Sequence, residues 1–274
     1  GAAFAANVSA AVAHVRANTR GAALGLDPEY LHQVRVGLRR LRSTLRVFRG
    51  LLRRRGARRL ERELRARQRV LGAARDWDEF VGAGFEPVLR RAARRPHAVA
   101  QQSARKTLTS AHFDSVLQDV LAWSGGKPWR ADSDPEESPE TFSRRALQRL
   151  YRASCRRATG INWADAERRH RVRIRLKRLR YGCECFASEY RPEETRRLLH
   201  RLHVLQRILG ELNDIQVQRM LLGELARNVG VAPPTDIARQ ALDARERQLI
   251  RGAGKSWSKF EAVRPYWRRR AARA

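Results

Sequence analysis

The sequence predicts an all-α fold made of two homologous halves. Leu, Ala, Arg, Glu and Gln dominate, and β-branched runs with a period of two are absent, which favours helices over strands. Hydrophobic residues make up 42% of the 274 residues, enough for a packed core. A segment of the first half also returns at a fixed spacing in the second. We therefore expect two four-helix bundles related by a pseudo-two-fold axis.

Gly and Pro divide the chain into roughly eight helical stretches. In chain order, the breaks fall at residues 25–28, 82–87, 96, 125–139, 192, 230–234 and 252–254. The longest, GGKPWRADSDPEESPE at residues 125–140, is polar, locally acidic and rich in Pro and Gly, as linkers are. The predicted organisation is a first four-helix half at residues 1–126, a linker at 127–140 and a second four-helix half at 141–274.

The two halves match at a constant offset of 138 residues. The segment HQVRVGLRRLR (residues 32–42) matches HRVRIRLKRLR (residues 170–180). The same offset pairs Phe4 with Phe142, Phe48 with Phe186, Gln68 with Gln206, Gly72 with Gly210 and Asp76 with Asp214. Arg and Leu could match by chance in so biased a chain, but His, Gln, Gly, Phe and Asp in one register indicate a duplication.

The charge of the chain indicates a polyanionic ligand. Lys and Arg number 58 against 28 Asp and Glu, a formal net charge of +30. The halves carry +12 (26 bases, 14 acids in residues 1–138) and +18 (32 bases, 14 acids in residues 139–274), so the charge is not a tail. Such an excess costs self-repulsion and predicts nucleic acid, an anionic membrane or a phosphate-rich ligand as partner.

Two further features narrow the class of protein. No run of 18 or more apolar residues occurs, so we expect no membrane-spanning segment. Of the three candidate polyanions, we do not expect a membrane to be the partner. The three cysteines are an odd number in a long chain, which indicates a reducing, cytoplasmic compartment rather than a disulfide framework.

Cations fall in rows on four predicted helices. On a helical wheel, the helix with His32 carries a row of cations beside an apolar stripe that includes Leu38, Leu41 and Leu45. The following helix carries a second row, and the second half repeats both. The candidate binding residues are His32, Arg35, Arg39, Arg42 and Arg46; Arg58, Arg62, Arg65 and Arg69; His170, Arg173, Lys177 and Arg180; and Arg196, His200, His203 and Arg207.

These rows are unusual for merely solvated faces. From Arg35 to Arg69 there are fifteen arginines and only two acids, Glu61 and Glu63. Like charges one helical turn apart destabilise a helix, so acidic partners would normally be interleaved. Because arginine forks suit phosphate, the rows predict an anionic-ligand surface.

The histidines and cysteines leave alternatives open. His32 and His170 head their rows and are either phosphate contacts or hydrogen-bonded structural residues. His200 and His203 are spaced to share a metal, but no clear third ligand accompanies them. Cys183 falls on an apolar face and is expected to be a buried structural thiol.

The motifs resemble those of the CHAD family, the conserved-histidine α-helical domains. The resemblance rests on HQVRVGLRRLRSTLRVF at 32–48, QRVLGAARD at 68–76, HRVRIRLKRLRY at 170–181 and LQRILGELND at 205–214. It implies two four-helix bundles around a basic central cavity, binding of inorganic polyphosphate, and association with polyphosphate granules in bacteria. By position, the lining residues would be His32, Arg35, Arg39, Arg42, His170, Arg173, Lys177 and Arg180.

The resemblance also bears on catalysis and cofactors. Some relatives carry a fused triphosphatase domain with an E-x-E-x-K string, which this sequence lacks, so a stand-alone, non-catalytic binding module is predicted. No cofactor is expected beyond a divalent cation accompanying the polyphosphate.

Two other functions compete with this prediction. A non-specific nucleic-acid binder would place aromatic residues among the cations for base stacking, and the rows contain none. A metal-dependent phosphohydrolase needs clustered carboxylates. The acids nearest the rows are Asp76, Asp78, Glu211 and Asp214, which we expect to lie near helix ends at Gly72 and Gly210 and to cap them or pair with Arg.

Overall fold

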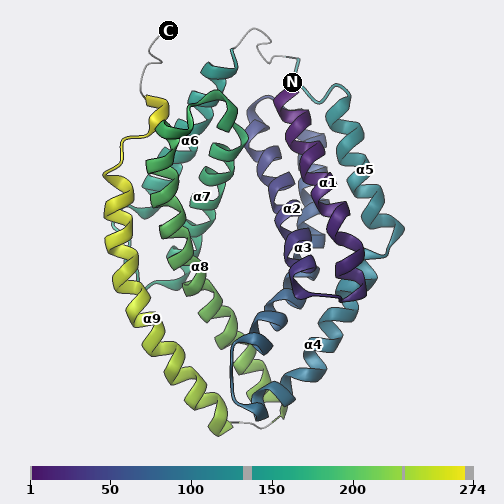
Figure 1. Ribbon diagram of the computed structural model, residues 1–274, viewed down its shortest axis with the longest axis vertical. Coiled ribbons are helices and arrows are strands. Elements are labelled where there is room, and N and C mark those ends of the chain that lie inside the picture. The colour runs from purple at the N-terminus through teal and green to yellow at the C-terminus, as the bar shows by residue number, and fades with distance from the viewer. Residues whose placement is uncertain (1, 132–137, 230–231, 269–274) are drawn as a thin grey trace. The chain divides into compact units, whose positions relative to one another are not determined.

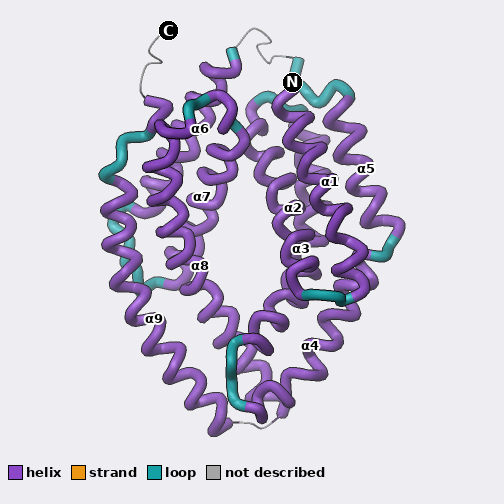
Figure 2. The backbone as a smooth tube through the Cα atoms, viewed as in Figure 1, coloured by secondary structure: helices purple, strands orange, loops and turns teal. Residues whose placement is uncertain are grey.

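The computed structural model describes residues 2–131, 138–229 and 232–268. Within these ranges it contains nine α-helices and no strand, which confirms the all-α prediction (Figures 1 and 2). The helices are α1 (Ala2–Leu24), α2 (Pro28–Val47), α3 (Arg54–Gly82), α4 (Pro87–Leu108), α5 (Ala111–Gly125), α6 (Pro139–Ala158), α7 (Ala166–Cys185), α8 (Pro192–Val229) and α9 (Ala232–Glu261).

The helices form two compact units. One comprises Gly1–Ser133 and Met220–Ala238, and the other comprises Asp134–Arg219 and Arg239–Ala274. The chain therefore passes between units within α8 and again within α9. Of the predicted linker, residues 132–137 lie outside the described residues. The predicted pseudo-two-fold axis and central cavity depend on how the halves are placed against each other, and both stay predictions.

The first half contains five helices rather than the expected four. Thr109 follows α4, and the Ser110 hydroxyl caps α5 by accepting a hydrogen bond from the Phe113 amide at 3.1 Å. Pro96 is an expected helix break but lies inside α4, where it has no backbone N–H to donate to the carbonyl oxygen four residues earlier. Gly254, also an expected break, lies inside α9, where a β-carbon would be in ordinary van der Waals contact with the Trp163 ring at 3.6 Å.

The helices of the repeat have equivalent boundaries. α2 and α7 begin and end 138 residues apart, and so do the starts of α3 and α8. Asp27 caps α2 by accepting from the Glu29 amide, and Asp165 caps α7 by accepting from the Arg168 amide. The two aspartates are themselves 138 residues apart. The predicted duplication therefore extends to the residues that start each helix.

Equivalent aromatic pairs also occupy the two cores. Phe4 meets Phe48 edge to face at 5.3 Å between ring centroids, and Phe142 meets Phe186 in the same way at 5.8 Å. All four rings are buried. Each pair joins the first helix of its half to the end of the helix that carries the histidine.

The apolar stripes predicted from the sequence form the cores. Leu38, Leu41 and Leu45 of α2 are buried, and the matching stripe of α7 is buried too, with Cys183 on it. α1 packs along α2 and α3 along α4, while α6 packs along α7 (Figure 1). Because the stripes pack inward, the cation rows lie on the remaining faces. Among the described helices, none is long and apolar enough to cross a bilayer.

Candidate functional site

The four rows differ in depth. We call them the α2 row (His32, Arg35, Arg39, Arg42 and Arg46), the α3 row (Arg58, Arg62, Arg65 and Arg69), the α7 row (His170, Arg173, Lys177 and Arg180) and the α8 row (Arg196, His200, His203 and Arg207). Every residue of the α3 and α8 rows is exposed, whereas the α2 row and most of the α7 row are partly buried. Each half therefore has one inner and one outer row.

The α2 row is held by polar groups of α3. Arg35 donates from Nη1 to the Leu71 carbonyl oxygen at 3.1 Å, and Arg42 donates from Nη1 to Gln68 Oε1. Gln68 in turn donates from Nε2 to the Arg35 carbonyl oxygen at 3.3 Å. Arg46 is paired with Glu61 of α3, its Nε 2.6 Å from Oε1. These contacts fix the guanidinium groups before any ligand arrives.

The position of the α2 row is unfavourable for its charges. Burial, with the nearby Arg46 and Arg65, lowers the pKa of Arg42 to about 10. Burial also lowers the pKa of Arg35, although Asp76 opposes this. A bound anion would relieve this cost, because it would supply the negative charge that the cations lack.

Burial and nearby arginines disfavour the protonated form of the His32 imidazole. Burial lowers its pKa below 6.5; Glu29 opposes the shift, and Arg75, Arg39 and Arg35 reinforce it. The imidazole of the free protein is therefore largely neutral at neutral pH. An anion beside it would favour the protonated form.

Gly72 makes room for Arg35. A β-carbon at this position would lie 2.9 Å from Arg35 Nη1, closer than such atoms approach. The matched Gly210 has nothing within 4 Å of that point. The prediction that the helices end near these glycines is wrong, since α3 continues to Gly82 and α8 to Val229. In α3 the glycine serves close packing rather than termination.

The α7 row has its own supporting contacts. His170 Nδ1 and Asn213 Oδ1 of α8 share a hydrogen bond of 3.0 Å. Arg180 lies 3.1 Å from a Glu184 carboxylate oxygen and over the Tyr181 ring, 4.7 Å from its centroid. Gln206, the counterpart of Gln68, donates to the Leu176 carbonyl oxygen at 2.8 Å. A glutamine thus ties the second row helix to the first in both halves.

The outer rows have no carboxylate partner among the residues that the structure describes. Within the described ranges, no residue of the α3 or α8 row forms an ion pair. Neighbouring arginines of α3 that lie off the row are paired instead, Arg59 with Asp119 at 2.9 Å and Arg67 with Glu63 at 2.5 Å. The acids of α3 therefore pair away from the α3 row, and both outer rows are open to an anion.

The acids near the rows are held by other groups. Asp78 Oδ1 lies 2.7 Å from His97 Nε2, and Glu211 pairs with Arg245 at 2.5 Å. The expected pairing with an arginine is confirmed for Glu211, which lies inside α8, whereas Asp78 contacts a histidine instead. In the part of the chain that the structure describes, no group of three His, Cys, Asp or Glu side chains is arranged to hold a metal ion.

Three polar residues of the site were not predicted from the sequence. Gln68 and Asn213 contact residues of the inner rows, and Gln206 donates to the α7 backbone at Leu176. None of the three carries a charge, so a pattern of cations does not reveal them. The sequence does mark two of them, because Gln68 and Gln206 match at the offset of the repeat. A polar residue that recurs in both copies beside a cation row is a candidate for positioning it.

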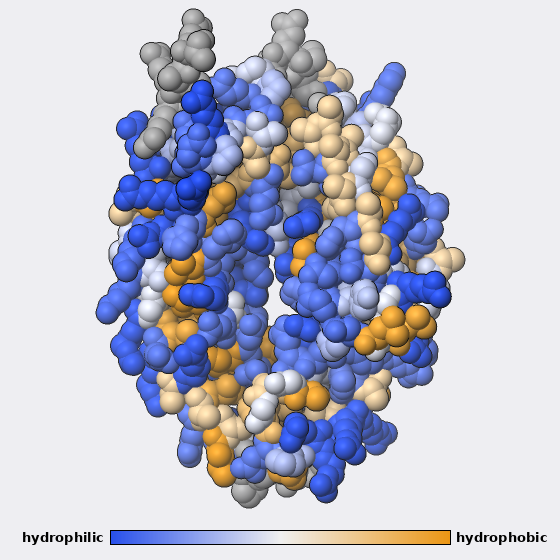
Figure 3. All heavy atoms as spheres, in the orientation of Figure 1, coloured by the Kyte–Doolittle hydropathy of each residue, from blue (hydrophilic) through white to orange (hydrophobic). Residues whose placement is uncertain are grey.

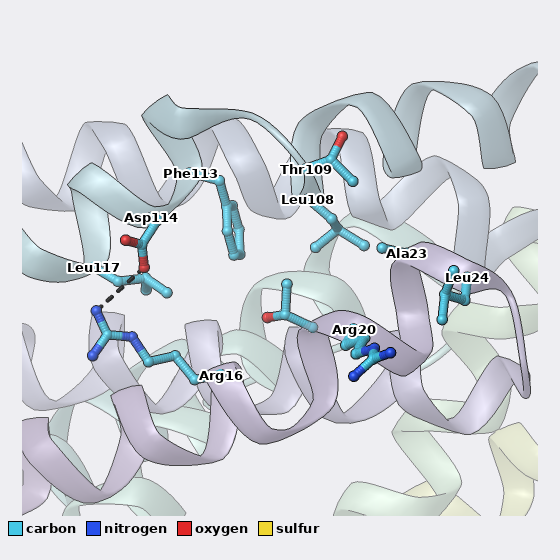
Figure 4. A pocket seen from close by; sticks show the side chains of 10 residues that line it. Arg16, Arg20, Ala23, Leu24, Leu108, Thr109, Phe113, Asp114 and Leu117 are labelled. Carbon is cyan, nitrogen blue, oxygen red and sulfur yellow. Dashed lines mark hydrogen bonds and ion pairs between the residues drawn. The ribbon is translucent and has the colours of Figure 1, made fainter.

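A pocket between α1 and α5 lies apart from the rows (Figure 4). Its volume is about 540 Å³, and apolar side chains such as Leu108, Phe113 and Leu117 form most of its wall. Its Arg16 is already paired with Asp114 at 3.2 Å. Because this pocket is mainly apolar and its Arg16 is already paired, the cation rows suit a large anion better than the pocket does. Hydrophilic residues cover much of the visible face of each unit (Figure 3).

Known proteins share the sequence motifs and the helical fold of this chain. A family model described as the CHAD domain matches residues 6–223. The crystal structure of the CHAD domain from the plant Ricinus communis has a TM-score of 0.82 and 30% identity, covering 96% of this chain and 92% of that chain. PptA from Streptomyces chartreusis has a TM-score of 0.73 at 16% identity, covering 96% and 99%, a likeness of fold. No curated protein matches the chain significantly.

Proposed function

The chain belongs to the CHAD family, and on that basis we propose that it binds inorganic polyphosphate, without catalysis, through the α2, α3, α7 and α8 rows. The observation that carries the proposal is the repetition of the rows. Both halves present an inner row on a helix to which a glutamine of the neighbouring helix is hydrogen-bonded, and an outer row free of ion pairs within the described residues.

The chemistry of polyphosphate fits such rows. The ligand is a flexible chain with about one negative charge per unit and no bases to read. Arginine forks one helical turn apart can follow it, because each fork can bind phosphate oxygens in a bidentate manner. Most of the affinity would come from charge neutralisation and counterion release. Binding of this kind would direct the protein to polyphosphate granules.

The same features argue against nucleic acid as the ligand. Single-strand binders stack bases on exposed aromatic rings. Here Trp77, Trp257 and Trp267 are buried, and Trp123 and Trp129 pack against Phe4. These five tryptophans therefore belong to the cores and offer no exposed ring on which a base could stack.

A competition experiment tests the proposal. Long-chain polyphosphate and single-stranded DNA of equal total charge compete for the protein at physiological salt. We expect polyphosphate to displace DNA at a far lower concentration than DNA displaces polyphosphate. Equal competition would contradict the proposal. Phosphate release from polyphosphate in the presence of magnesium or manganese would contradict the non-catalytic part.

A further inference from the structure

Four arginines outside the rows crowd the start of α4. Arg90, Arg91, Arg94 and Arg95 are all exposed, and none forms an ion pair with another described residue. The first turn of α4 contains no acid, and the Glu86 side chain makes no capping hydrogen bond. The first three turns of α4 therefore carry four positive charges that have no ion-pair partner among the described residues.

This arrangement works against the helix. The start of a helix carries the positive end of its dipole over about one turn, so Arg90, at the end of the first turn of α4, is unfavourably placed. Arg90 and Arg94 are also one turn apart, as are Arg91 and Arg95, and like charges at that spacing repel. By contrast, Arg156 and Arg157 lie in the last turn of α6, where the dipole favours cations. The α4 arginines lack that explanation.

Three of the four arginines share a pocket. Arg90, Arg91 and Arg94 line a hollow of about 350 Å³ together with Val81, Pro87 and His97. His97 is fixed by its hydrogen bond to Asp78 of α3, whose side chain is only 6% exposed. The pocket thus has one wall from the end of α3 and a cationic wall from α4.

We propose that this α4 pocket binds a compact phosphate anion of the pyrophosphate type. Guanidinium groups in a small pocket suit a short, highly charged anion, whereas the rows suit an extended chain. The pocket uses none of the residues of the four rows, so its ligand does not depend on the function proposed for them.

Calorimetric titration with inorganic pyrophosphate tests the pocket. The full chain is compared with Arg90→Gln/Arg91→Gln/Arg94→Gln and with a control of equal charge, Arg152→Gln/Arg156→Gln/Arg157→Gln, whose arginines are exposed on α6. We expect the α4 variant to bind pyrophosphate about tenfold more weakly or worse and the control to bind like the unmodified chain. Equal losses in both variants, or no binding by the unmodified chain, would overturn the proposal.

Two further measurements separate the pocket from the rows and from misfolding. The α4 variant should keep its affinity for long-chain polyphosphate within about twofold, while Arg58→Gln/Arg62→Gln/Arg65→Gln/Arg69→Gln should keep its affinity for pyrophosphate. A parallel loss of both ligands in the α4 variant would mean that the arginines only extend the rows, which contradicts a separate site. Without ligand, the α4 variant should melt at the same or a higher temperature, because repulsion is removed.

Discussion

The cations of the α2 row occupy positions that burial and their neighbours make costly. Arg42 is the clearest case, since burial and two nearby arginines bring its pKa to about 10 while Gln68 holds its guanidinium in place. A protein can keep such a cation where function needs it, at some cost to stability. At the scale of single residues, the structure thus favours a binding role over a solvated face.

The matched glycines give a direct comparison. Gly210→Ala should stabilise the protein by about 0.5–1 kcal/mol, because the site is open and alanine favours a helix interior. Gly72→Ala should gain less or lose stability, since its β-carbon displaces the Arg35 guanidinium from the Leu71 carbonyl. Chemical denaturation of both variants measures the difference. Equal gains would show that Arg35 moves freely and is not fixed by this contact.

His32 predicts a pH dependence of polyphosphate binding. The pKa of the free imidazole lies below 6.5, and bound phosphate would raise it, so binding takes up a proton in the interval between the two values. Affinity should therefore rise as pH falls through the pKa of the bound state and level off below that of the free state.

The variant His32→Gln isolates this contribution. Affinities are measured from pH 5 to 8 at constant ionic strength for both proteins, and their ratio cancels the other histidines and the titration of the ligand. We expect the ratio of unmodified to variant affinity to grow as pH falls. A constant ratio would show that His32 is a structural residue without phosphate contact.

At the scale of helices, the positive charges within each outer row repel one another. The α3 row carries four like charges at helical spacing, and the acids of the same helix pair elsewhere. Replacing Arg58, Arg62, Arg65 and Arg69 by Gln should therefore raise the free energy of unfolding by roughly 0.5–1.5 kcal/mol. It should also reduce the salt dependence of polyphosphate binding, with the slope of log K against log salt falling by roughly 3.

Arg67→Gln is the control for the α3 row. Its side chain is nearly buried and paired with Glu63, so its loss should lower stability by about 1–3 kcal/mol. The salt dependence should be unchanged, because Arg67 is off the row. If the row variant were destabilised like Arg67→Gln, the row would be a structural feature of α3 rather than a ligand surface.

The helices show what periodicity can and cannot predict. The stripes of α2 and α7, the duplicated boundaries and the exposed rows follow from local spacing and a repeated pattern, which are fully present in the sequence. Gly72 was mistaken for a helix end because a glycine that relieves crowding and one that stops a helix look alike in sequence. The extra helix of the first half depends on one capping serine, Ser110. The hydrogen bonds of Gln68 and Gln206 require knowing which helices pack together.

At the scale of the whole molecule, the net charge of +30 is divided between two homologous halves. Each half contributes an inner row fixed by the adjacent helix and an outer row open to solvent. The passage of the chain between units within α8 and α9 was not predicted, because it depends on contacts far apart in sequence. The function proposed for the molecule requires both halves, since a long polyanion gains affinity with every cation it meets.

The most direct measurement of that claim is the affinity for long-chain polyphosphate after changing two inner-row residues in each half. The variant Arg35→Gln/Arg39→Gln/Arg173→Gln/Lys177→Gln should keep its helical circular dichroism. At physiological salt, it should bind polyphosphate about a hundredfold more weakly than the unmodified chain, or not at all. Intact helicity with affinity within a few fold of the unmodified chain would contradict the account and place the binding site elsewhere.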